Sequence, residues 1–390
     1  MRQGTSNSAD ASDGMRIAVL NPTASGMSGG YRSYLRNILP RFAADERVEA
    51  LLCCTLASLR AEEWIPRHEK MRFAACPPFS PLRPGLGGKL TGLLETFRPD
   101  ILFVPTARAV RFGNVPVVTM VQNMAPLGPW KSYGPAEWPR LAVQWLETRR
   151  AVRRADGVVA ISGFVREFLR DEWAVPEMKI ASSYFGAPAP SAAQVRPARL
   201  PVDWSDFIFT AGSLEPYRCL EDLVACAEHS RTKRGRPLRI VLAGSARAAM
   251  KSYESRLKAM AEKRGVTSDL CWIGQLTSAE MSWCYANCAA FVMTSRIEAC
   301  PNTALEALAC GAICIVADNP PLPELFAEAA LYYTPGSGEM LAARIGEIRS
   351  WSAARKTEAS AAAVARSRRF SWETASRETL DFLERVSRSR

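Results

Sequence analysis

Histidine and long hydrophobic runs are both scarce in this sequence, and each shortage excludes a class of protein. The 390 residues include only two histidines, His68 and His229. A His-rich metal site is therefore not expected, and a Ser-His-Asp triad has few candidates. The largest apolar runs, such as residues 312–317, are far shorter than the roughly 20 residues that span a bilayer.

The cysteine pattern does not indicate a disulfide framework or a metal centre. The 11 cysteines are an odd number, and the N-terminus shows no charged-then-apolar secretory pattern. We therefore expect reduced thiols in a cytoplasmic protein. Cys284 and Cys288 lie four residues apart but lack partners at zinc-site spacing, so helix packing is favoured over a metal site.

Positive charge is in excess, with 50 Lys and Arg against 39 Asp and Glu and a net charge of +11. This balance favours anionic partners, which include nucleotide phosphates, acidic lipid headgroups and nucleic acid. Basic residues cluster at 149–154, on one predicted helix. The cluster fits either a solvated basic face or docking on acidic lipid at the inner face of the cytoplasmic membrane. No nucleic-acid-reading motif accompanies it, so nucleic acid is not the expected partner.

Short apolar runs alternate with longer amphipathic stretches along most of the chain. Runs buried on both faces and separated by helices predict parallel sheets wrapped by helices, the α/β class. The expected strands lie at 16–20, 101–104, 116–121, 157–161, 207–211, 238–243, 270–273, 289–293 and 312–316.

A length of 390 residues predicts two domains, or three at most. The segment 186–203 holds four prolines without a clear period, which indicates a linker that acts as a hinge. We expect a disordered leader at 1–14, with Met15 as an alternative start, an N-terminal domain at 15–190 and a second domain at 191–369. A final helix at about 370–390 is expected to dock on the first domain.

Two glycine-containing turns follow predicted strands and suit the approach of a ligand. Gly29 and Gly30 open a helix, where a tight turn is an equally good interpretation, and the spacing is not that of a dinucleotide fingerprint. In the second half, GSLEPYR places Ser213 as a hydrogen-bond donor and Arg218 as a phosphate clamp. Taken alone, Arg218 fits a solvated surface residue equally well.

The segment 291–312 contains the most informative pattern. A predicted strand feeds a loop with Glu298, and Pro301 occupies the expected first position of a helix that carries Glu306. The free amides of residues 302–303 are suited to a diphosphate, and Glu306 to the hydroxyls of a ribose. Two solvated glutamates flanking a helix start are the simpler alternative.

These motifs together resemble the retaining GT-B glycosyltransferases of the group 1, or family 4, type. The resemblance runs from residue 207 to about 335 and includes GSLEPYR, IVLAG, WIGQLTSAEMSWCYANC, the Glu-x7-Glu stretch with ACGA, and NPPLPELF. The first half agrees less specifically, through the glycine turn and ADGVVAISGFVREFL. The resemblance implies two Rossmann-like domains that face each other across a cleft. The N-terminal domain is expected to bind the acceptor and the second domain the donor, and the C-terminal helix is expected to return to the first domain.

The family transfers a sugar, here expected to be hexose-type, from a nucleoside-diphosphate sugar to an acceptor hydroxyl. Anomeric configuration is retained, and neither a metal nor another cofactor is needed. By this resemblance, Arg218 stabilises the leaving diphosphate, Glu298 lies near the sugar and Glu306 holds the ribose, while Ile273 and Gly274 lie beside the base. The other donor-side residues that it implies are Gly29, Gly30, Ser213, Gly244, Cys300, Pro301, Asn302 and Thr303.

Two positions depart from the family pattern. Ser213 stands where an arginine is usual, and Gln122-Asn123 stand where many members have a histidine. The amides of Gln122 and Asn123 hydrogen-bond but exchange no proton near neutral pH. Together with Trp130, Tyr133 and Trp138 they are candidate acceptor-side residues, although the aromatic rings fit packing under a Pro-rich loop equally well.

The expected acceptor is a glycan or a lipid-linked molecule of bacterial-type surface polysaccharide or glycoconjugate synthesis. Two other functions stay open at this point. One is a nucleotide-sugar epimerase of the same fold, and the other is a basic protein that binds a membrane surface or nucleic acid without catalysis. The sequence does not identify the donor nucleotide.

Overall fold

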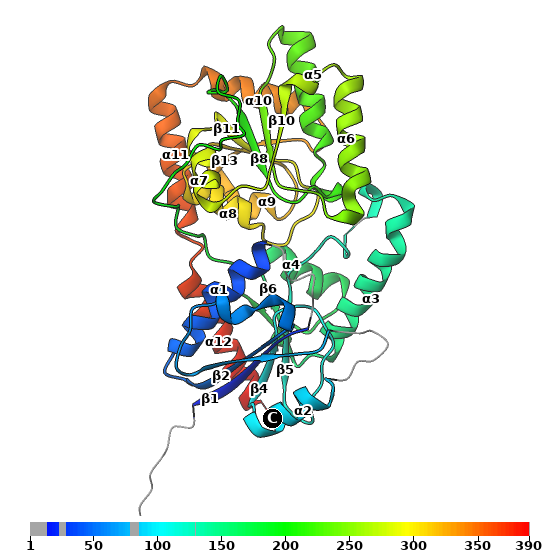
Figure 1. Ribbon diagram of the computed structural model, residues 1–390, viewed down its shortest axis with the longest axis vertical. Helices are drawn as coiled ribbons and strands as arrows, with labels where there is room; N and C mark the ends of the chain where they lie inside the picture. The colour runs from blue at the N-terminus through cyan, green and yellow to red at the C-terminus, as the bar shows by residue number, and fades with distance from the viewer. Residues whose placement is uncertain (1–13, 23–28, 79–85, 129, 390) are drawn as a thin grey trace, which may run out of the picture. The chain divides into compact units, whose positions relative to one another are not determined.

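The computed structural model describes residues 14–22, 29–78, 86–128 and 130–389 (Figure 1). Contacts divide the chain into two compact units. The first comprises Met1–Met120, Arg150–Val158 and Ser376–Arg390, and the second comprises Val121–Arg149 and Val159–Ala375. Apart from Gly14, the leader expected at 1–14 lies outside the described residues.

The first parallel sheet has seven strands in the order β3-β2-β1-β4-β5-β6-β7. Its inner strands β4 and β6 are buried along their whole length, as expected for strands that helices cover on both faces. The strands are β1 (Met15–Asn21), β2 (Val48–Thr55), β3 (Met71–Ala75), β4 (Ile101–Val104), β5 (Val117–Val121), β6 (Gly157–Ala160) and β7 (Ile180–Ser182).

The second parallel sheet has six strands in the order β10-β9-β8-β11-β12-β13, and all of them lie in the second unit. This order matches that of a doubly wound nucleotide-binding sheet, in which ligands bind where the strand order reverses, here between β8 and β11. The strands are β8 (Ile208–Ala211), β9 (Ile240–Ala243), β10 (Leu270–Gly274), β11 (Ala290–Met293), β12 (Cys314–Ala317) and β13 (Ala330–Tyr333).

Helices connect the strands and cover the sheets. Their ends follow local sequence signals; for example, Thr277 and Glu280 form a reciprocal capping box at the start of α7. The α-helices are α1 (Gly29–Ala44), α2 (Gly88–Phe97), α3 (Trp138–Arg154), α4 (Gly163–Glu167), α5 (Glu221–Arg234), α6 (Lys251–Lys263), α7 (Ser278–Asn287), α8 (Asn302–Ala309), α9 (Leu322–Phe326), α10 (Gly338–Ser350), α11 (Ala353–Ser367) and α12 (Trp372–Arg388).

The α/β, GT-B-type architecture expected from the sequence is confirmed, and all nine predicted strands are present within one or two residues of their expected ends. Four further strands were not predicted: β2, β3, β7 and β13. Three of these, β3, β7 and β13, are short and only partly buried, so they lack the continuous apolar run that marks the inner strands.

The last helix, expected from the sequence at about 370–390, buries several apolar side chains. Leu380, Phe382 and Leu383 of α12 are each at most 2% exposed. A Cβ atom at Gly157 would lie only 2.6 Å from the Phe382 ring, so the first residue of β6 must be small. Residues 376–388 of this helix belong to the compact unit that contains β1–β4.

The Pro-rich segment 186–203 contains no helix or strand, and it lies within the second unit. The Ala187 amide donates to the Phe370 carbonyl (2.8 Å), and the Ser191 amide donates to Ser282 Oγ (3.0 Å). The role of the segment as a hinge stays a prediction. Within the described part of the chain, no helix has both the length and the apolar character needed to cross a membrane.

Candidate active site

Most of the predicted donor-side residues lie at the carboxyl ends of four neighbouring strands. Gly274 ends β10, Gly244 follows β9, Ser213 follows β8, and Glu298 lies in the loop after β11. The loops are tied together, since the Gly244 amide donates to the Gly274 carbonyl (2.8 Å). In a parallel sheet this edge is where ligands bind.

Two glycines let the loops after β8 and β9 approach each other closely. Gly212 has φ +138° and Gly244 has φ +125°, values that residues with side chains rarely adopt. A Cβ atom at Gly244 would lie 1.9 Å from the Gly212 carbonyl oxygen, and one at Gly212 would lie 2.4 Å from the Arg218 guanidinium. The absence of a side chain at Gly212 therefore makes room for Arg218, and its absence at Gly244 makes room for the Gly212 backbone.

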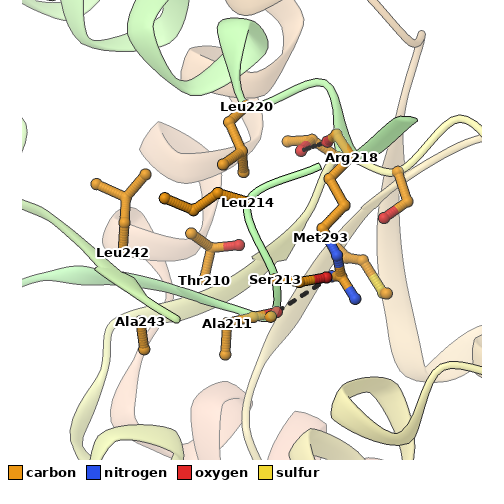
Figure 2. A pocket seen from close by; sticks show the side chains of 12 residues that line it. Thr210, Ala211, Ser213, Leu214, Arg218, Leu220, Leu242, Ala243 and Met293 are labelled. Carbon is orange, nitrogen blue, oxygen red and sulfur yellow. Dashed lines mark hydrogen bonds between the residues drawn. The ribbon is translucent and has the colours of Figure 1, made fainter. Parts of the chain in front are cut away.

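Arg218 lies in a short 3₁₀ turn (Pro216–Arg218), three residues before α5, and its side chain points back toward the end of β8 (Figure 2). Its Nη1 donates to the Ala211 carbonyl (3.2 Å), and its Nη2 lies 3.6 Å from Glu298 Oε1. Among the described residues, the buried Nε has no hydrogen-bond partner. The guanidinium thus keeps a free N–H group inside the site.

Glu298 is the buried anionic partner of Arg218. The Ser295 hydroxyl donates to Glu298 Oε1 (2.8 Å), and the side chain of Glu298 is 10% exposed. Burial raises the pKa of Glu298, while Arg218 and the Ser295 hydrogen bond act in the opposite direction. Burial also opposes the charge of Arg218, but Glu298 and Tyr217 outweigh it and raise the pKa of Arg218, so the guanidinium stays cationic.

The loop after β11 ends at the start of α8. Pro301 precedes this helix as its cap rather than occupying the first helical position, so that expectation was wrong by one residue. The reason is its backbone: Pro301 has an extended ψ of 121°, and its carbonyl accepts the Ala304 amide (3.0 Å). Asn302 and Thr303 form the first turn, where amides have no partner within the helix. Thr303 Oγ1 is buried without a partner among the described residues.

Glu306 lies one turn further along α8, on a half-buried position. Tyr285 of α7 donates its hydroxyl to Glu306 Oε2 (3.0 Å). Burial raises the pKa of Glu306 to about 7, while the Tyr285 hydrogen bond lowers it. The Tyr285 ring packs edge-on against Phe209 and Phe291, with centroids 5.2 Å apart in each case, so the hydroxyl is held in place by the core.

A small pocket opens between the ends of β8 and β11, and Figure 2 shows its lining. Ser213 and Arg218 line it, together with Thr294 and Ser295 from the loop after β11. Other predicted residues are placed differently. The Ile273 side chain is 1% exposed and belongs to the core, and Cys300 is buried, which raises the pKa of its thiol to about 12.

The remaining predicted positions lie outside this group. Gly29 and Gly30 are the first residues of α1, in the first unit, and their role stays a prediction. Gln122 and Asn123 directly follow β5. Asn123 is exposed, and its Oδ1 accepts the Ala125 amide (3.0 Å), a local turn bond.

The candidate acceptor-side aromatic residues differ in exposure. Trp130 is half-buried and donates its indole N–H to the Pro126 carbonyl (2.9 Å). Tyr133 is 6% exposed, and burial, with Glu215 nearby, raises the pKa of its phenol. Such burial favours a packing role for Tyr133. Trp138, at the start of α3, is 47% exposed.

Some residues that build this site were missed by sequence reasoning. Ser295 could have been found from the sequence, because it is a hydroxyl residue only three positions before Glu298, to which it donates a hydrogen bond. Tyr285 is 21 residues from Glu306, and no short-range pattern links the two. Glu215 is buried and accepts the Arg247 Nε–H (2.6 Å), a contact between the loops after β8 and β9 that only the fold creates.

Comparisons with known proteins identify the family of both halves of the chain. Residues 195–364 match the family model described as glycosyl transferases group 1, and residues 28–185 match the model of glycosyltransferase family 4. No curated protein matches the chain in sequence.

Solved structures of similar fold cover nearly the whole chain. Anabaena HepE, determined in complex with UDP-glucose, has a TM-score of 0.69 at 18% identity and covers 95% of this chain and 100% of its own. Sucrose-phosphate synthase from Thermosynechococcus elongatus has a TM-score of 0.73 at 15% identity and covers 95% and 98%. WaaG, a glycosyltransferase involved in lipopolysaccharide biosynthesis, has a TM-score of 0.68 at 12% identity and covers 94% and 99%. At these identities the likeness establishes the fold.

Proposed function

The chain belongs to the glycosyl transferases of group 1, and on that premise we propose that it moves a hexose-type sugar from a nucleoside-diphosphate sugar to an acceptor hydroxyl. One observation supports this most strongly: the buried Arg218–Glu298 pair lies where the strand order of the second sheet reverses. Glu298 is in the loop that leads into α8, four residues before the helix begins. A cation with a free N–H group next to a helix N-terminus suits a diphosphate.

The proposed donor position follows from the chemistry of each group. The diphosphate lies against Arg218 and the amides of Asn302 and Thr303, where the free guanidinium N–H and the helix N-terminus both favour negative charge. Glu306, fixed by Tyr285, accepts hydrogen bonds from the ribose hydroxyls. Glu298 lies on the sugar side of Arg218. The base lies beside the backbone of Gly244 and Ile273–Gly274, since the Ile273 side chain is in the core.

We propose that transfer retains the anomeric configuration. The bond between the sugar C1 and the phosphate oxygen breaks, and the acceptor oxygen bonds to C1 on the same face. The acceptor proton passes to the leaving phosphate oxygen, so no side-chain base is required. Arg218 and the N-terminus of α8 stabilise the negative charge that develops on the diphosphate, an effect worth roughly 10²- to 10³-fold in rate. In this scheme those groups replace a metal ion.

The donor and the acceptor are proposed from chemistry and from the neighbours. HepE was solved with UDP and with UDP-glucose, which makes a uridine nucleotide the first donor to test. WaaG acts in lipopolysaccharide biosynthesis, which supports a glycan or lipid-linked acceptor of surface polysaccharide or glycoconjugate synthesis. The net charge of +11 favours attraction to the anionic lipids of the inner face of the cytoplasmic membrane. We therefore propose that the enzyme acts in the cytoplasm at this surface, beside a lipid-linked acceptor.

The test is a thermal-shift screen against UDP, GDP, dTDP and their sugars, followed by NMR of the product formed with a simple glycoside acceptor. We expect stabilisation by one nucleotide family and an anomeric configuration equal to that of the donor. An inverted product would overturn retention. Release of an epimerised sugar without acceptor would indicate an epimerase, and no stabilisation by any nucleotide would overturn the donor site.

A further inference from the structure

The loop after β11 is fastened to the turn that carries Arg218 by contacts that the proposed reaction does not use. The Thr294 hydroxyl donates to the Arg218 carbonyl, and the Arg296 amide donates to the Tyr217 carbonyl (2.7 Å). Both contacts follow from the pairing of β8 with β11, which brings the two loops to the same edge of the sheet. The backbone of the loop is therefore held against this turn two residues before Glu298.

The side chain of Arg296 supplies a second anchor, because it pairs with Asp222 in the first turn of α5. Arg296 Nη2 lies 3.4 Å from both Asp222 carboxylate oxygens. Asp222 is 5% exposed, and its Oδ2 also accepts the Tyr333 hydroxyl and the Gly336 amide, each at 2.9 Å. Burial opposes the charge of Arg296, but Cys219 and Asp222 outweigh it and raise the pKa of Arg296. The ion pair thus ties the loop after β11 to a carboxylate that is already held in place.

The anchored loop keeps Glu298 near Arg218 without a hydrogen bond between them. Glu298 Oε1 lies 3.6 Å from Arg218 Nη2, beyond the roughly 3.2 Å that an N–H···O hydrogen bond allows. It accepts the Ser295 hydroxyl instead (2.8 Å). A carboxylate that moved closer would make a two-point contact with the guanidinium and occupy the N–H groups that a diphosphate needs. The separation of the two side chains therefore decides how much of Arg218 is available to a ligand.

We propose that Arg296 and Asp222 are positioning residues of the donor site, which hold Glu298 apart from Arg218 so that the guanidinium keeps its N–H groups for a diphosphate. The inference rests on the proposed donor function and assigns a role to two residues outside the proposed donor position. Without the ion pair, the loop moves toward the turn and Glu298 pairs directly with Arg218. The cation is then neutralised within the protein before the ligand binds.

The test is calorimetric titration of the full chain with UDP, GDP and dTDP, repeated on two variants that break the ion pair. Arg296→Ala leaves Asp222 with two hydrogen bonds, so this variant is expected to fold. Asp222→Asn keeps the size of the side chain and an oxygen that accepts from Tyr333 and Gly336. We expect the nucleotide that binds the wild type best to bind either variant roughly fivefold more weakly.

The sign of the change in Asp222→Asn separates positioning from simple electrostatics. This substitution removes a negative charge from the second unit, and long-range attraction alone would then strengthen the binding of an anionic nucleotide. Positioning predicts weaker binding, because Arg296 loses its charged partner and the loop is released. Arg296→Lys keeps the charge facing Asp222 and should recover part of the affinity that Arg296→Ala loses.

The effect should depend on Glu298, through which both residues act. In a Glu298→Gln background the neutral amide does not pair as an ion with Arg218, so Arg296→Ala should weaken nucleotide binding less than about twofold. A second measurement needs no ligand. The coupling between Arg218→Ala and Glu298→Gln in urea denaturation should be roughly twofold larger in the Arg296→Ala background, where the two side chains pair directly.

Arg231 provides a matched control in the same unit. It pairs with Asp269, which is 2% exposed and directly precedes β10, at the edge of the sheet opposite the donor loops. Arg231→Ala therefore also removes the cation from a half-buried ion pair. It should lower the urea midpoint about as much as Arg296→Ala does and leave nucleotide affinity unchanged.

Wild-type or tighter nucleotide binding by folded Arg296→Ala or Asp222→Asn would overturn the proposal. An equal loss of affinity in the presence and absence of the Glu298 carboxylate would overturn it as well, since the residues would then not act through Glu298. If the wild type binds none of the three nucleotides, the donor site is wrong. The ligand-free coupling still decides the positioning role in that case, and a coupling that Arg296→Ala leaves unchanged would contradict it.

Discussion

The two sheets share the order of their first six strands but differ in the polar groups at two of their central strand ends. In the first sheet, Asn21 ends β1 and Thr55 ends β2, and both are buried and neutral. In the second, the ends of β8 and β11 enclose the Arg218–Glu298 ion pair. Topology therefore fixes which edge receives a ligand, and the side chains there decide which chemistry it accepts. The ion pair at the ends of β8 and β11 suits a diphosphate, and the neutral groups of Asn21 and Thr55 suit hydroxyl groups.

Removing the charge from the second sheet should give the largest effect. Arg218→Ala is expected to lower kcat/KM for transfer by roughly 10²- to 10³-fold, because the leaving diphosphate loses its cation. Glu306→Ala should lower it by a similar factor through loss of the ribose contact. Both are measured by initial rates with the identified donor, with circular dichroism as a check of folding.

Arg218→Lys keeps the charge but not the planar fork, so its kcat/KM should lie between that of the wild type and that of Arg218→Ala. Turnover near that of the wild type in both alanine variants would contradict the site assignment.

The close approach of the loops after β8 and β9 can be tested by adding a single methyl group at Gly244. Gly244→Ala places a methyl group 1.9 Å from the Gly212 carbonyl oxygen at a φ of +125°, so we expect a loss of about 3 kcal/mol in unfolding free energy. Gly235→Ala is the matched control, because Gly235 also has a positive φ (+61°) but open space around it, and should lose about 1 kcal/mol. Urea denaturation measures both. Equal losses would show that the contact with Gly212 adds nothing.

The ionisation of Glu306 makes the charge of the second site depend on pH. Burial raises its pKa to about 7, so the carboxylate forms between pH 6 and 8, and nucleotide affinity should rise over that range by up to about tenfold. The same pKa affects stability. The Glu306 carboxyl of the folded protein loses its proton at a higher pH than that of the unfolded chain, whose pKa is the ordinary 4.5. The contribution of Glu306 to the free energy of unfolding therefore falls as pH rises from 4.5 to about 7. Titration calorimetry and thermal unfolding of wild type and Glu306→Gln check both trends. Identical pH profiles for the two proteins would show that another group is responsible.

The smallest effect is expected on the acceptor side. Trp130→Ala should raise the acceptor KM roughly fivefold, about 1 kcal/mol, and leave nucleotide affinity unchanged, because the half-buried ring makes its hydrogen bond locally, to the Pro126 carbonyl, and not to a candidate donor residue. Trp130→Phe should retain most of the affinity, since it keeps an aromatic face. Steady-state kinetics with varied acceptor and a nucleotide titration separate the two effects. A change in nucleotide affinity alone would move Trp130 to the donor side.

The sequence predicts the inner strands, and the positions of the candidate donor loops that follow them, because both depend on local patterns. Runs such as 101–104 and 289–293 are apolar on both faces, whereas β7 has three residues and β13 is mostly half-exposed. The Arg218–Glu298 pair joins residues 80 positions apart, and it forms because β8 and β11 are neighbours in the sheet. Tyr285 reaches Glu306 only through the packing of α7 beside α8. Such contacts follow from strand order, which short motifs do not encode.

The central claim is that the charged edge of the second sheet binds a nucleoside-diphosphate sugar. Its most direct test is calorimetric titration of the wild type and Arg218→Ala with UDP, GDP, dTDP and their sugars. The account predicts that one nucleoside diphosphate binds the wild type at least about tenfold more tightly than it binds the variant. Binding of none of these compounds, or equal binding by both proteins, would contradict it.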